Sequence, residues 1–324
     1  MIQFDRKSIR TWSMLGPSGV LGLAACEFAE TDKDFAIVTA DLCSFSGLDR
    51  FKTNYPDRIY NVGIAEQNMI GVAAGMAKEG MNVFATTYAT FASTRVLDQV
   101  KVNMGYMGLP VKLVGLTSGF SVGILGPTHM SMEDLAIMRS IPNMIVFSPS
   151  DCTETMKVLI AASNVEAPVY IRMSGTSRSP VIYSEDYDFT IGKAVRLKEG
   201  EDVCIMATGT MVNLSLKIAE EMEKEGVSCE VINFHTIKPI DEEMIINACN
   251  KKCIVTIEEH SRIGGFGSAV AEVLAPLRKK VPHLIIGTED HYPHASSYVN
   301  LLRQNGLTED IIYEKIKKFF KENE

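Results

Sequence analysis

The sequence predicts an α/β protein of two domains, each built around a doubly wound, mostly parallel sheet. At 324 residues and 46% hydrophobic, the chain is long enough to bury two full cores. Short β-branched runs alternate with helical patterns along both halves. These runs are nearly continuous in apolar residues, which is typical of strands that helices cover on both faces.

The first domain is predicted over residues 1–178. Its strands are the runs FAIVTADL, RIYNVGI, NVFATTY, VKLVGL, MIVFSPS and PVYIRMS, in that order. Pro142 and Asn143 end one helix, and Ser150 or Asp151 is expected to cap the next one. The helix before that break is expected to be opened by Ser131.

A polar, irregular stretch follows Ser174, and we place a linker at residues 179–190. The second domain is predicted over residues 191–324. Its strands are DVCIMATGT, SCEVINFHTI, KCIVTIEEH and HLIIGTED. Leu214, Ile218 and Met222 recur at helical spacing, and Gly226 stands where a C-cap glycine belongs.

Composition narrows the classes of partner. The formal net charge is −8 and Lys and Arg form no basic run, which argues against nucleic acid or an anionic membrane as the main partner. No apolar run reaches the length of a membrane span, and the first residues lack a signal peptide's apolar core, so we expect a cytoplasmic protein. The seven cysteines are scattered, and no metal site is predicted on this chain.

The stretch NVGIAEQNMIGVAAGMA opens a helix rich in Gly and Ala, with Glu66 near its start. The helix dipole favours a carboxylate there, so Glu66 taken alone is interpreted as a structural residue at the helix start rather than as a chemical group. Tyr88 and Phe91 are three residues apart and are expected to share a face, either as core residues or as a platform for a flat ring.

His129 follows a Gly-Pro-Thr turn, in a loop where parallel sheets bind ligands. Arg172 ends the strand PVYIRMS, where a guanidinium could meet either a phosphate or a neighbouring carboxylate. The glycine turn IGGFGS lacks the third glycine of a dinucleotide fingerprint, so we expect only a tight helix start there.

Taken together, these motifs resemble the C-terminal part of transketolase. TADL, GIAEQNM, YATFA, GPTH, RSIPNMIVFSPSDCTE and PVYIRMS follow the order and spacing of that family, and EEHSRIGGFGSAVAEVL continues them. The resemblance implies a pyrimidine-binding domain of the thiamine diphosphate type followed by a transketolase C-terminal domain.

The resemblance also implies partners. It implies a thiamine diphosphate cofactor with Mg²⁺, whose diphosphate and metal ligands would lie on a separate N-terminal subunit. The chain would then be the C-terminal subunit of a split transketolase, active only with that subunit, in an α2β2-type assembly with self-association as a dimer. Its substrates would be sugars or sugar phosphates.

Each site residue takes its implied role from the matching position in the family. Glu66 matches the glutamate that hydrogen-bonds the aminopyrimidine of thiamine diphosphate and shares its proton. Tyr88 and Phe91 match aromatic residues around that ring, and Asp41 matches an aspartate near the cofactor. His129 matches a histidine facing the reacting carbons, and Arg172 matches an arginine that grips a substrate phosphate.

Three positions depart from the family. Leu125 stands where an aspartate usually contacts a donor-sugar hydroxyl, and Thr117 and Phe45 replace phosphate-site histidine and serine. These losses suggest ketol transfer from an atypical ketose. The alternatives are the beta subunit of a 2-oxo acid dehydrogenase, a deoxyxylulose phosphate synthase-like enzyme, and a scaffolding subunit without its own catalysis.

Overall fold

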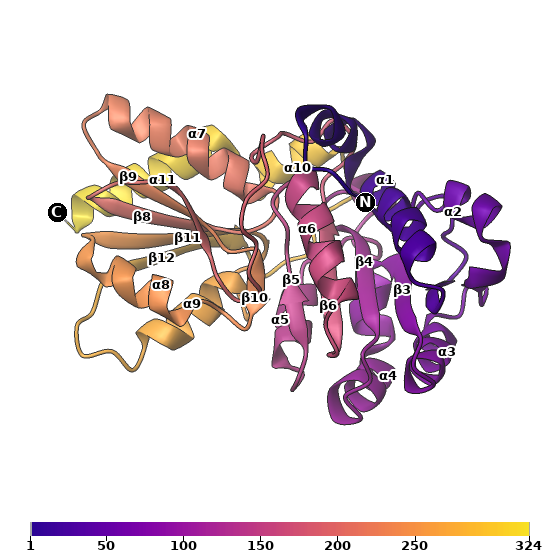
Figure 1. Ribbon diagram of the computed structural model, residues 1–324. Coiled ribbons are helices and arrows are strands. Elements are labelled where there is room, and N and C mark those ends of the chain that lie inside the picture. Colours follow the sequence, from indigo (N-terminus) through magenta and orange to yellow (C-terminus); the bar gives the residue numbers. More distant parts are fainter. Residues whose placement is uncertain (1, 324) are drawn as a thin grey trace.

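The computed structural model describes residues 2–323, which form two α/β domains side by side (Figure 1). The first domain carries a sheet of order β10-β5-β6-β4-β3-β1-β2, and the second a sheet of order β12-β11-β8-β9-β7. Neighbouring strands are parallel except for β10 with β5 and β7 with β9. The predicted fold class is therefore confirmed.

The strands lie close to the predicted runs. They are β1 (Phe35–Thr39), β2 (Ile59–Asn61), β3 (Asn82–Tyr88), β4 (Lys112–Ser118), β5 (Ile145–Phe147), β6 (Val169–Ser174), β7 (Val195–Lys198), β8 (Val203–Ala207), β9 (Cys229–Asn233), β10 (Thr236–Lys238), β11 (Cys253–Ser261) and β12 (His283–Thr288).

The α-helices connect these strands. They are α1 (Arg6–Thr31), α2 (Asp49–Asn54), α3 (Glu66–Lys78), α4 (Leu97–Gln99), α5 (Asp134–Ser140), α6 (Cys152–Ser163), α7 (Met211–Lys224), α8 (Glu242–Asn247), α9 (Phe266–Leu274), α10 (Tyr298–Gln304) and α11 (Glu309–Glu322). Two π-helical segments, η2 (Phe91–Arg95) and η3 (Val100–Tyr106), flank α4.

Helices cover both faces of each sheet, as the apolar strands require. The residues of α1 and α6 pack on one face of the first sheet, and those of α7 and α11 on one face of the second (Figure 1). A third core cluster contains residues of α3, α5, α8 and α9 together with strands of both sheets. Because this core runs across the domain boundary, the two domains are packed against each other.

Two details of the predicted elements are wrong. The run SCEVINFHTI, predicted as one strand, is divided between β9 and β10, and β10 crosses over to pair with β5 of the first sheet. The helix expected to open at Ser131 begins at Asp134. Ser131 instead forms an isolated β-bridge with Gly119, and the Asp134 side chain makes a buried ion pair with Arg172. The predicted cap at Asp151 is confirmed by its bond from Glu154 N.

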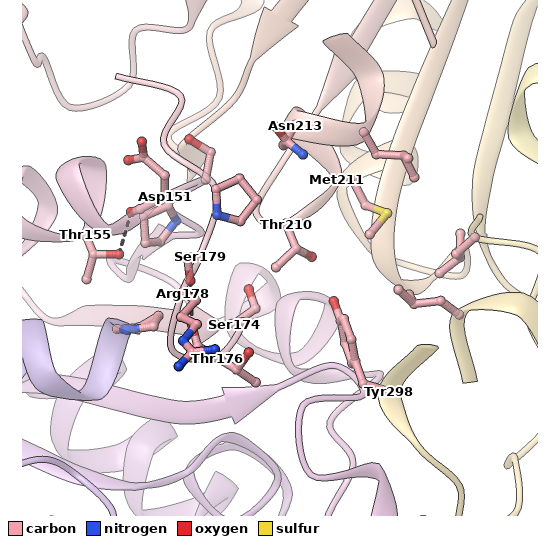
Figure 2. A pocket seen from close by; sticks show the side chains of 18 of the residues that line it. Asp151, Thr155, Ser174, Thr176, Arg178, Ser179, Thr210, Met211, Asn213 and Tyr298 are labelled. Atoms are coloured by element: carbon pink, nitrogen blue, oxygen red, sulfur yellow. Dashed lines mark hydrogen bonds between the residues drawn. The ribbon is translucent and has the colours of Figure 1, made fainter. Parts of the chain in front are cut away.

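The stretch expected as a linker is irregular but docked. Asp151 accepts hydrogen bonds from the backbone N–H groups of Ile182 and Tyr183, at 2.8 and 2.9 Å. Where this stretch leaves β6, a cavity of about 330 Å³ lies between the two domains (Figure 2). The segment therefore connects the domains along a fixed path.

The residues from 2 to 323 contain no helix that is both long and apolar enough to span a membrane. The seven cysteines are free thiols, and all but Cys43 are buried. Among the same residues, no group of His, Cys, Asp and Glu side chains is arranged to hold a metal ion.

A buried carboxylate fixes the tight start of α9. Glu258 in β11 accepts hydrogen bonds from Phe266 N at 2.6 Å and Gly267 N at 2.7 Å. Burial raises the pKa of Glu258 to about 7, although these two N–H groups and nearby arginines oppose that rise.

This pKa predicts a pH-dependent stability difference for Glu258→Gln. Because the folded pKa lies above the ordinary value of 4.5, the stability that neutral Glu258 contributes is present below about pH 4.5 and is lost as pH rises through about 7. The Gln variant lacks this titration, so its free energy of unfolding relative to wild type should rise between pH 5 and pH 8. Urea denaturation at each pH measures this, and a constant difference would contradict the raised pKa.

Candidate functional site

Glu66 is the first residue of α3, and its side chain is only 4% exposed. Its Oε1 accepts a hydrogen bond from Nη1 of Arg95 at 2.7 Å. The Arg95 guanidinium also lies over the ring of Phe91, 3.8 Å from the ring centroid. A buried carboxylate therefore lies beside an aromatic face, and an arginine links the two.

Aromatic rings gather at this point. Phe91 lies 6.1 Å from Tyr88 and 5.3 Å from His129, measured between ring centroids, and Tyr88 lies 6.2 Å from His129. Phe45 adds a fourth ring, 6.3 Å from Tyr88. Tyr88 ends β3, and burial raises the pKa of its phenol. The structure thus brings together three of the predicted residues from separate segments.

Asp41 follows β1 and makes its side-chain contact with Asn61. Its Oδ1 accepts from Asn61 Nδ2 at 3.0 Å, and its backbone N–H donates to Asn61 Oδ1 at 2.9 Å. Asp41 adopts a left-handed backbone with φ of 60°, which the two-way bond to Asn61 supports. The side chain is exposed at the carboxyl end of β1, the edge where open parallel sheets bind ligands.

A groove of about 510 Å³ opens beside the aromatic group, lined by residues of both domains. The first domain contributes Phe91, Arg95 and Glu133, and the second contributes Tyr292. The Tyr292 hydroxyl lies 3.3 Å from Glu133 Oε1, to which it donates. The sequence analysis missed Arg95, Glu133 and Tyr292. Only Arg95 carried a signal, as a lone cation four residues after Phe91.

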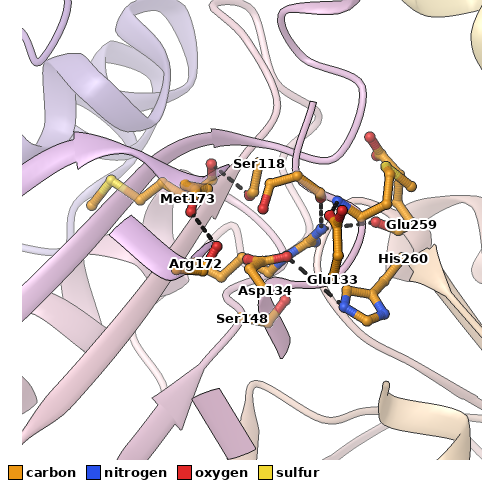
Figure 3. A network of polar contacts seen from close by, with 12 residues as sticks. Ser118, Glu133, Asp134, Ser148, Arg172, Met173, Glu259 and His260 are labelled. Atoms are coloured by element: carbon orange, nitrogen blue, oxygen red, sulfur yellow. Dashed lines mark hydrogen bonds and ion pairs between the residues drawn. The ribbon is translucent and has the colours of Figure 1, made fainter. Parts of the chain in front are cut away.

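Arg172 corrects an expectation. Its side chain is 1% exposed, and its Nε donates to Asp134 Oδ2 at 2.9 Å (Figure 3). Its Nη2 donates to the backbone oxygen of Glu259 at 2.8 Å. Since the guanidinium is enclosed and paired, it does not offer a grip for a substrate phosphate. Of the two possibilities at this position, the structure shows the neighbouring carboxylate.

The network around Arg172 joins the two domains. Asp134 and Arg172 belong to the first domain, whereas Glu259 and His260 come from β11 of the second (Figure 3). Tyr170 donates to Asp134 at 2.8 Å, and His260 Nε2 lies 4.0 Å from Asp134 Oδ1. Burial lowers the pKa of His260 to about 4, against the attraction of Asp134, so this imidazole is neutral near pH 7.

The departures from the family pattern lie at exposed or strained positions. Leu125 ends a 3₁₀ turn just before the Gly-Pro-Thr-His loop and is 48% exposed, and Phe45 is 66% exposed. Thr117 has a left-handed φ of 51° near the end of β4. The apolar side chains of Leu125 and Phe45 therefore face solvent at positions where the resemblance implies polar ones.

The fold and the side chains at this edge together define a class of protein. A buried carboxylate, an aromatic face and an imidazole lie in segments that follow the carboxyl ends of parallel strands, the usual place for a ligand site in an open α/β sheet. The fold and these residues define a two-domain α/β protein with a candidate small-molecule site at this edge.

Comparison with known families identifies the particular family. Residues 17–177 match the model of the transketolase pyrimidine-binding domain, and residues 192–312 match the transketolase C-terminal domain. The chain belongs to the transketolase family, and it is a transketolase-type enzyme chain that corresponds to these two domains.

Individual relatives agree with this assignment. The "6-deoxy-6-sulfo-D-fructose transketolase subunit SqwH" of Clostridium sp. (strain MSTE9) is 42% identical over 87% of each chain. A "putative transketolase C-terminal section" of Methanocaldococcus jannaschii is 39% identical, covering 93% of this chain and 95% of the relative. A solved split gene transketolase, described as an inactive beta4 tetramer, is 36% identical with a TM-score of 0.88, covering 96% of this chain and 100% of that one.

The buried ion pair predicts a large stability effect. Asp134→Ala leaves the Arg172 guanidinium buried without its carboxylate, so the free energy of unfolding should fall by about 3–5 kcal/mol. Urea denaturation of the full chain measures the change. Glu221→Ala breaks an exposed pair with Lys224 and serves as the control, which should shift stability far less. Equal effects of the two variants would contradict the structural role of the buried pair.

Proposed function

We propose that this chain is the C-terminal subunit of a split, cytoplasmic transketolase that moves a two-carbon ketol unit from a ketose to an aldose. Thiamine diphosphate and Mg²⁺ are its cofactors, and the diphosphate and metal ligands lie on an N-terminal partner subunit. The observation that carries this proposal is the buried Glu66 carboxylate, which pairs with Arg95 where that guanidinium covers the ring of Phe91 at the wall of the groove.

The residues present fit the aminopyrimidine end of thiamine diphosphate. Glu66 supplies a buried carboxylate for a ring nitrogen, and Phe91 and Tyr88 supply apolar ring faces at contact distance from each other. When bound, the cofactor supplies the carbanion-stabilising chemistry of ketol transfer. Because Arg95 pairs with Glu66 and covers Phe91, ring binding here requires its guanidinium to move aside.

The residues of this chain at the site then have proposed roles in the reaction. Glu66 holds a proton at the cofactor ring, and the buried setting of its carboxylate keeps water from competing for it. His129 is half-buried against Phe91, and its Nδ1 lies 3.0 Å from Thr128 Oγ1, which orients the ring. An imidazole so placed moves protons to and from sugar oxygens. Asp41 stays a proposed cofactor contact, held in place by Asn61.

The substrate is proposed to be an atypical ketose. Leu125 and Phe45 present apolar surface where the family places an aspartate and a serine. The hydroxyl and the phosphate of the usual donor sugar would therefore lose polar contacts at these two positions. The relative named for 6-deoxy-6-sulfo-D-fructose shows that a chain of this length and similar sequence serves an unusual ketose. These observations favour a modified sugar over the ordinary pentose phosphates.

The outer face of α3 is the proposed partner surface. Gly71 and Gly75 are exposed, and a Cβ added at either one would meet no atom of the described chain within 4 Å. Ile64, just before the helix, is 78% exposed, and Tyr106 on η3 is 87% exposed. Apolar side chains beside small residues suit close packing of a second subunit next to Glu66. The beta4 tetramer of the solved relative supports self-association as well.

Reconstitution with the N-terminal subunit tests the function. The mixed subunits with thiamine diphosphate and Mg²⁺ should transfer glycolaldehyde units from at least one ketose in a panel that includes 6-deoxy-6-sulfo-D-fructose and the pentose phosphates. Glu66→Gln should lower kcat by about 10²–10⁴-fold through loss of acid–base help. Glu314→Gln, at an exposed position of α11 in the second domain, should leave kcat unchanged. Absence of cofactor-dependent transfer with every ketose would refute the proposal.

The variant Gly71→Trp tests whether the outer face of α3 is the partner surface. The isolated variant should be as stable as wild type or slightly more so, since glycine in a helix interior costs roughly 0.5–1 kcal/mol relative to alanine. Assembly with the N-terminal subunit should be lost, as followed by analytical ultracentrifugation. Lys217→Trp, at an exposed position of α7, is the matched control and should assemble normally. Normal assembly of Gly71→Trp would show that the partner binds elsewhere.

A further inference from the structure

Arg95 lies where the buried carboxylate of the site meets its aromatic face. Its Nη1 donates to Glu66 Oε1 at 2.7 Å, and its guanidinium carbon lies over the ring of Phe91, 3.8 Å from the ring centroid. A guanidinium is planar and carries N–H donors along its edge. The side chain therefore presents a flat face to Phe91 and a donating edge to Glu66, as an amino-substituted aromatic ring would.

The covered face of Phe91 has room for one flat group. A separation of 3.8 Å is contact distance for carbon atoms, so the guanidinium fills the layer directly above the ring. Tyr88 and His129 pack against the same ring, with centroids 6.1 and 5.3 Å away. A ring that stacks on this face and bonds Glu66 must therefore take the place of the guanidinium.

The backbone of Arg95 is held beside Glu66. Arg95 ends the π-helical segment η2, a kind of turn that is frequent at functional sites. Thr94 Oγ1 donates to the backbone oxygen of Thr90 at 2.6 Å, and Gln67 Nε2 of α3 donates to the backbone oxygen of Arg95 at 3.2 Å. A movement of the guanidinium therefore needs only the side-chain torsions of Arg95 to change.

The groove beside Phe91 gives this side chain a place to move. Arg95 lines the groove of about 510 Å³, and its side chain is 44% exposed. Glu133 lines the same groove, and its Oε1 accepts a 3.3 Å hydrogen bond from the Tyr292 hydroxyl. A guanidinium that leaves Glu66 thus enters a space that holds solvent and a second carboxylate.

Glu66 needs a partner when no ring is present. Its side chain is 4% exposed, and within residues 2–323 Arg95 is the one group that donates a hydrogen bond to its carboxylate. A buried carboxylate that lacks a partner destabilises a fold. Arg95 therefore compensates Glu66 in the chain by itself.

We infer that Arg95 is a substitute for the cofactor ring in this chain. Its guanidinium pairs with Glu66 and covers Phe91 until an aminopyrimidine ring displaces it into the groove. The inference rests on the proposed function for the identity of that ring. Arg95 keeps Glu66 paired before assembly, and it lowers the affinity for the ring because only molecules with the guanidinium displaced are competent to bind.

Titration of the isolated full chain with 4-amino-5-hydroxymethyl-2-methylpyrimidine at pH 8 tests the displacement. This probe is uncharged there, so loss of a positive charge does not by itself change its affinity. Arg95→Ala should bind the probe about ten-fold more tightly than wild type or better, measured by isothermal calorimetry. Lys217→Ala, which removes the same charge from an exposed position of α7, should bind it as weakly as wild type.

Equal affinity of wild type and Arg95→Ala, or no binding by either, would overturn the inference. The titration contains neither the N-terminal subunit nor a ketose. Its outcome is therefore separate from the assay of ketol transfer, and failure of one does not imply failure of the other.

Thermal unfolding of the same variants tests whether Arg95 compensates the buried carboxylate. Arg95→Ala should lower the melting temperature, because it leaves Glu66 buried without its cation. Adding Glu66→Gln should restore most of that loss, since a neutral amide needs no cation, and the recovery measures the coupling of the two side chains. Lys217→Ala should leave the melting temperature unchanged. A loss that Glu66→Gln does not restore would show that Arg95 acts through packing alone, against the inference.

Discussion

The buried ion pair between Asp134 and Arg172 is the interaction on which the arrangement of the two domains depends. A charge in an interior is tolerated when it is paired and hydrogen-bonded, and Arg172, besides its pair with Asp134, donates to the Glu259 backbone oxygen of the second domain. The second sheet must therefore sit with β11 against the start of α5. Arg172 also donates to the backbone oxygen of Ser131, two residues after His129, and Tyr292 of the second domain lies at the wall of the groove.

This docking sets the carboxyl edges of the two sheets near each other, and both cavities follow from it. One opens beside Glu66 and the aromatic rings, and the other encloses Ser174 and Thr210. Glu259 links the domain contact to the second cavity. Its backbone oxygen accepts a hydrogen bond from Arg172, and its carboxylate accepts hydrogen bonds from Thr210, Tyr298 and the backbone N–H of Phe120. A change at Glu259 therefore affects the domain contact and the wall of the cavity at Thr210 and Tyr298 together.

Local patterns predicted most of the fold because they depend on neighbours in the sequence. Apolar runs gave the positions of the strands, Asp151 was expected as a cap, and the helix at Glu66 begins where the small-residue pattern begins. The crossing of β10 to the first sheet was missed, because a short apolar run carries no information on which sheet it joins. The π-helical turn at Phe91–Arg95 was missed for a similar reason, since its i→i+5 bonds have no sequence signature.

By itself the sequence determined the fold class, the family and the candidates Glu66, Tyr88, Phe91 and His129, since periodicity and ordered motifs are properties of the chain. Only the tertiary structure decided which of them meet, that Arg95 pairs with Glu66, and that Arg172 lies inside the protein rather than at the mouth of the sheet. The physical reason is that burial and pairing depend on what the rest of the fold brings to a side chain. The sequence around Arg172 does not specify whether its guanidinium pairs with a phosphate or with Asp134.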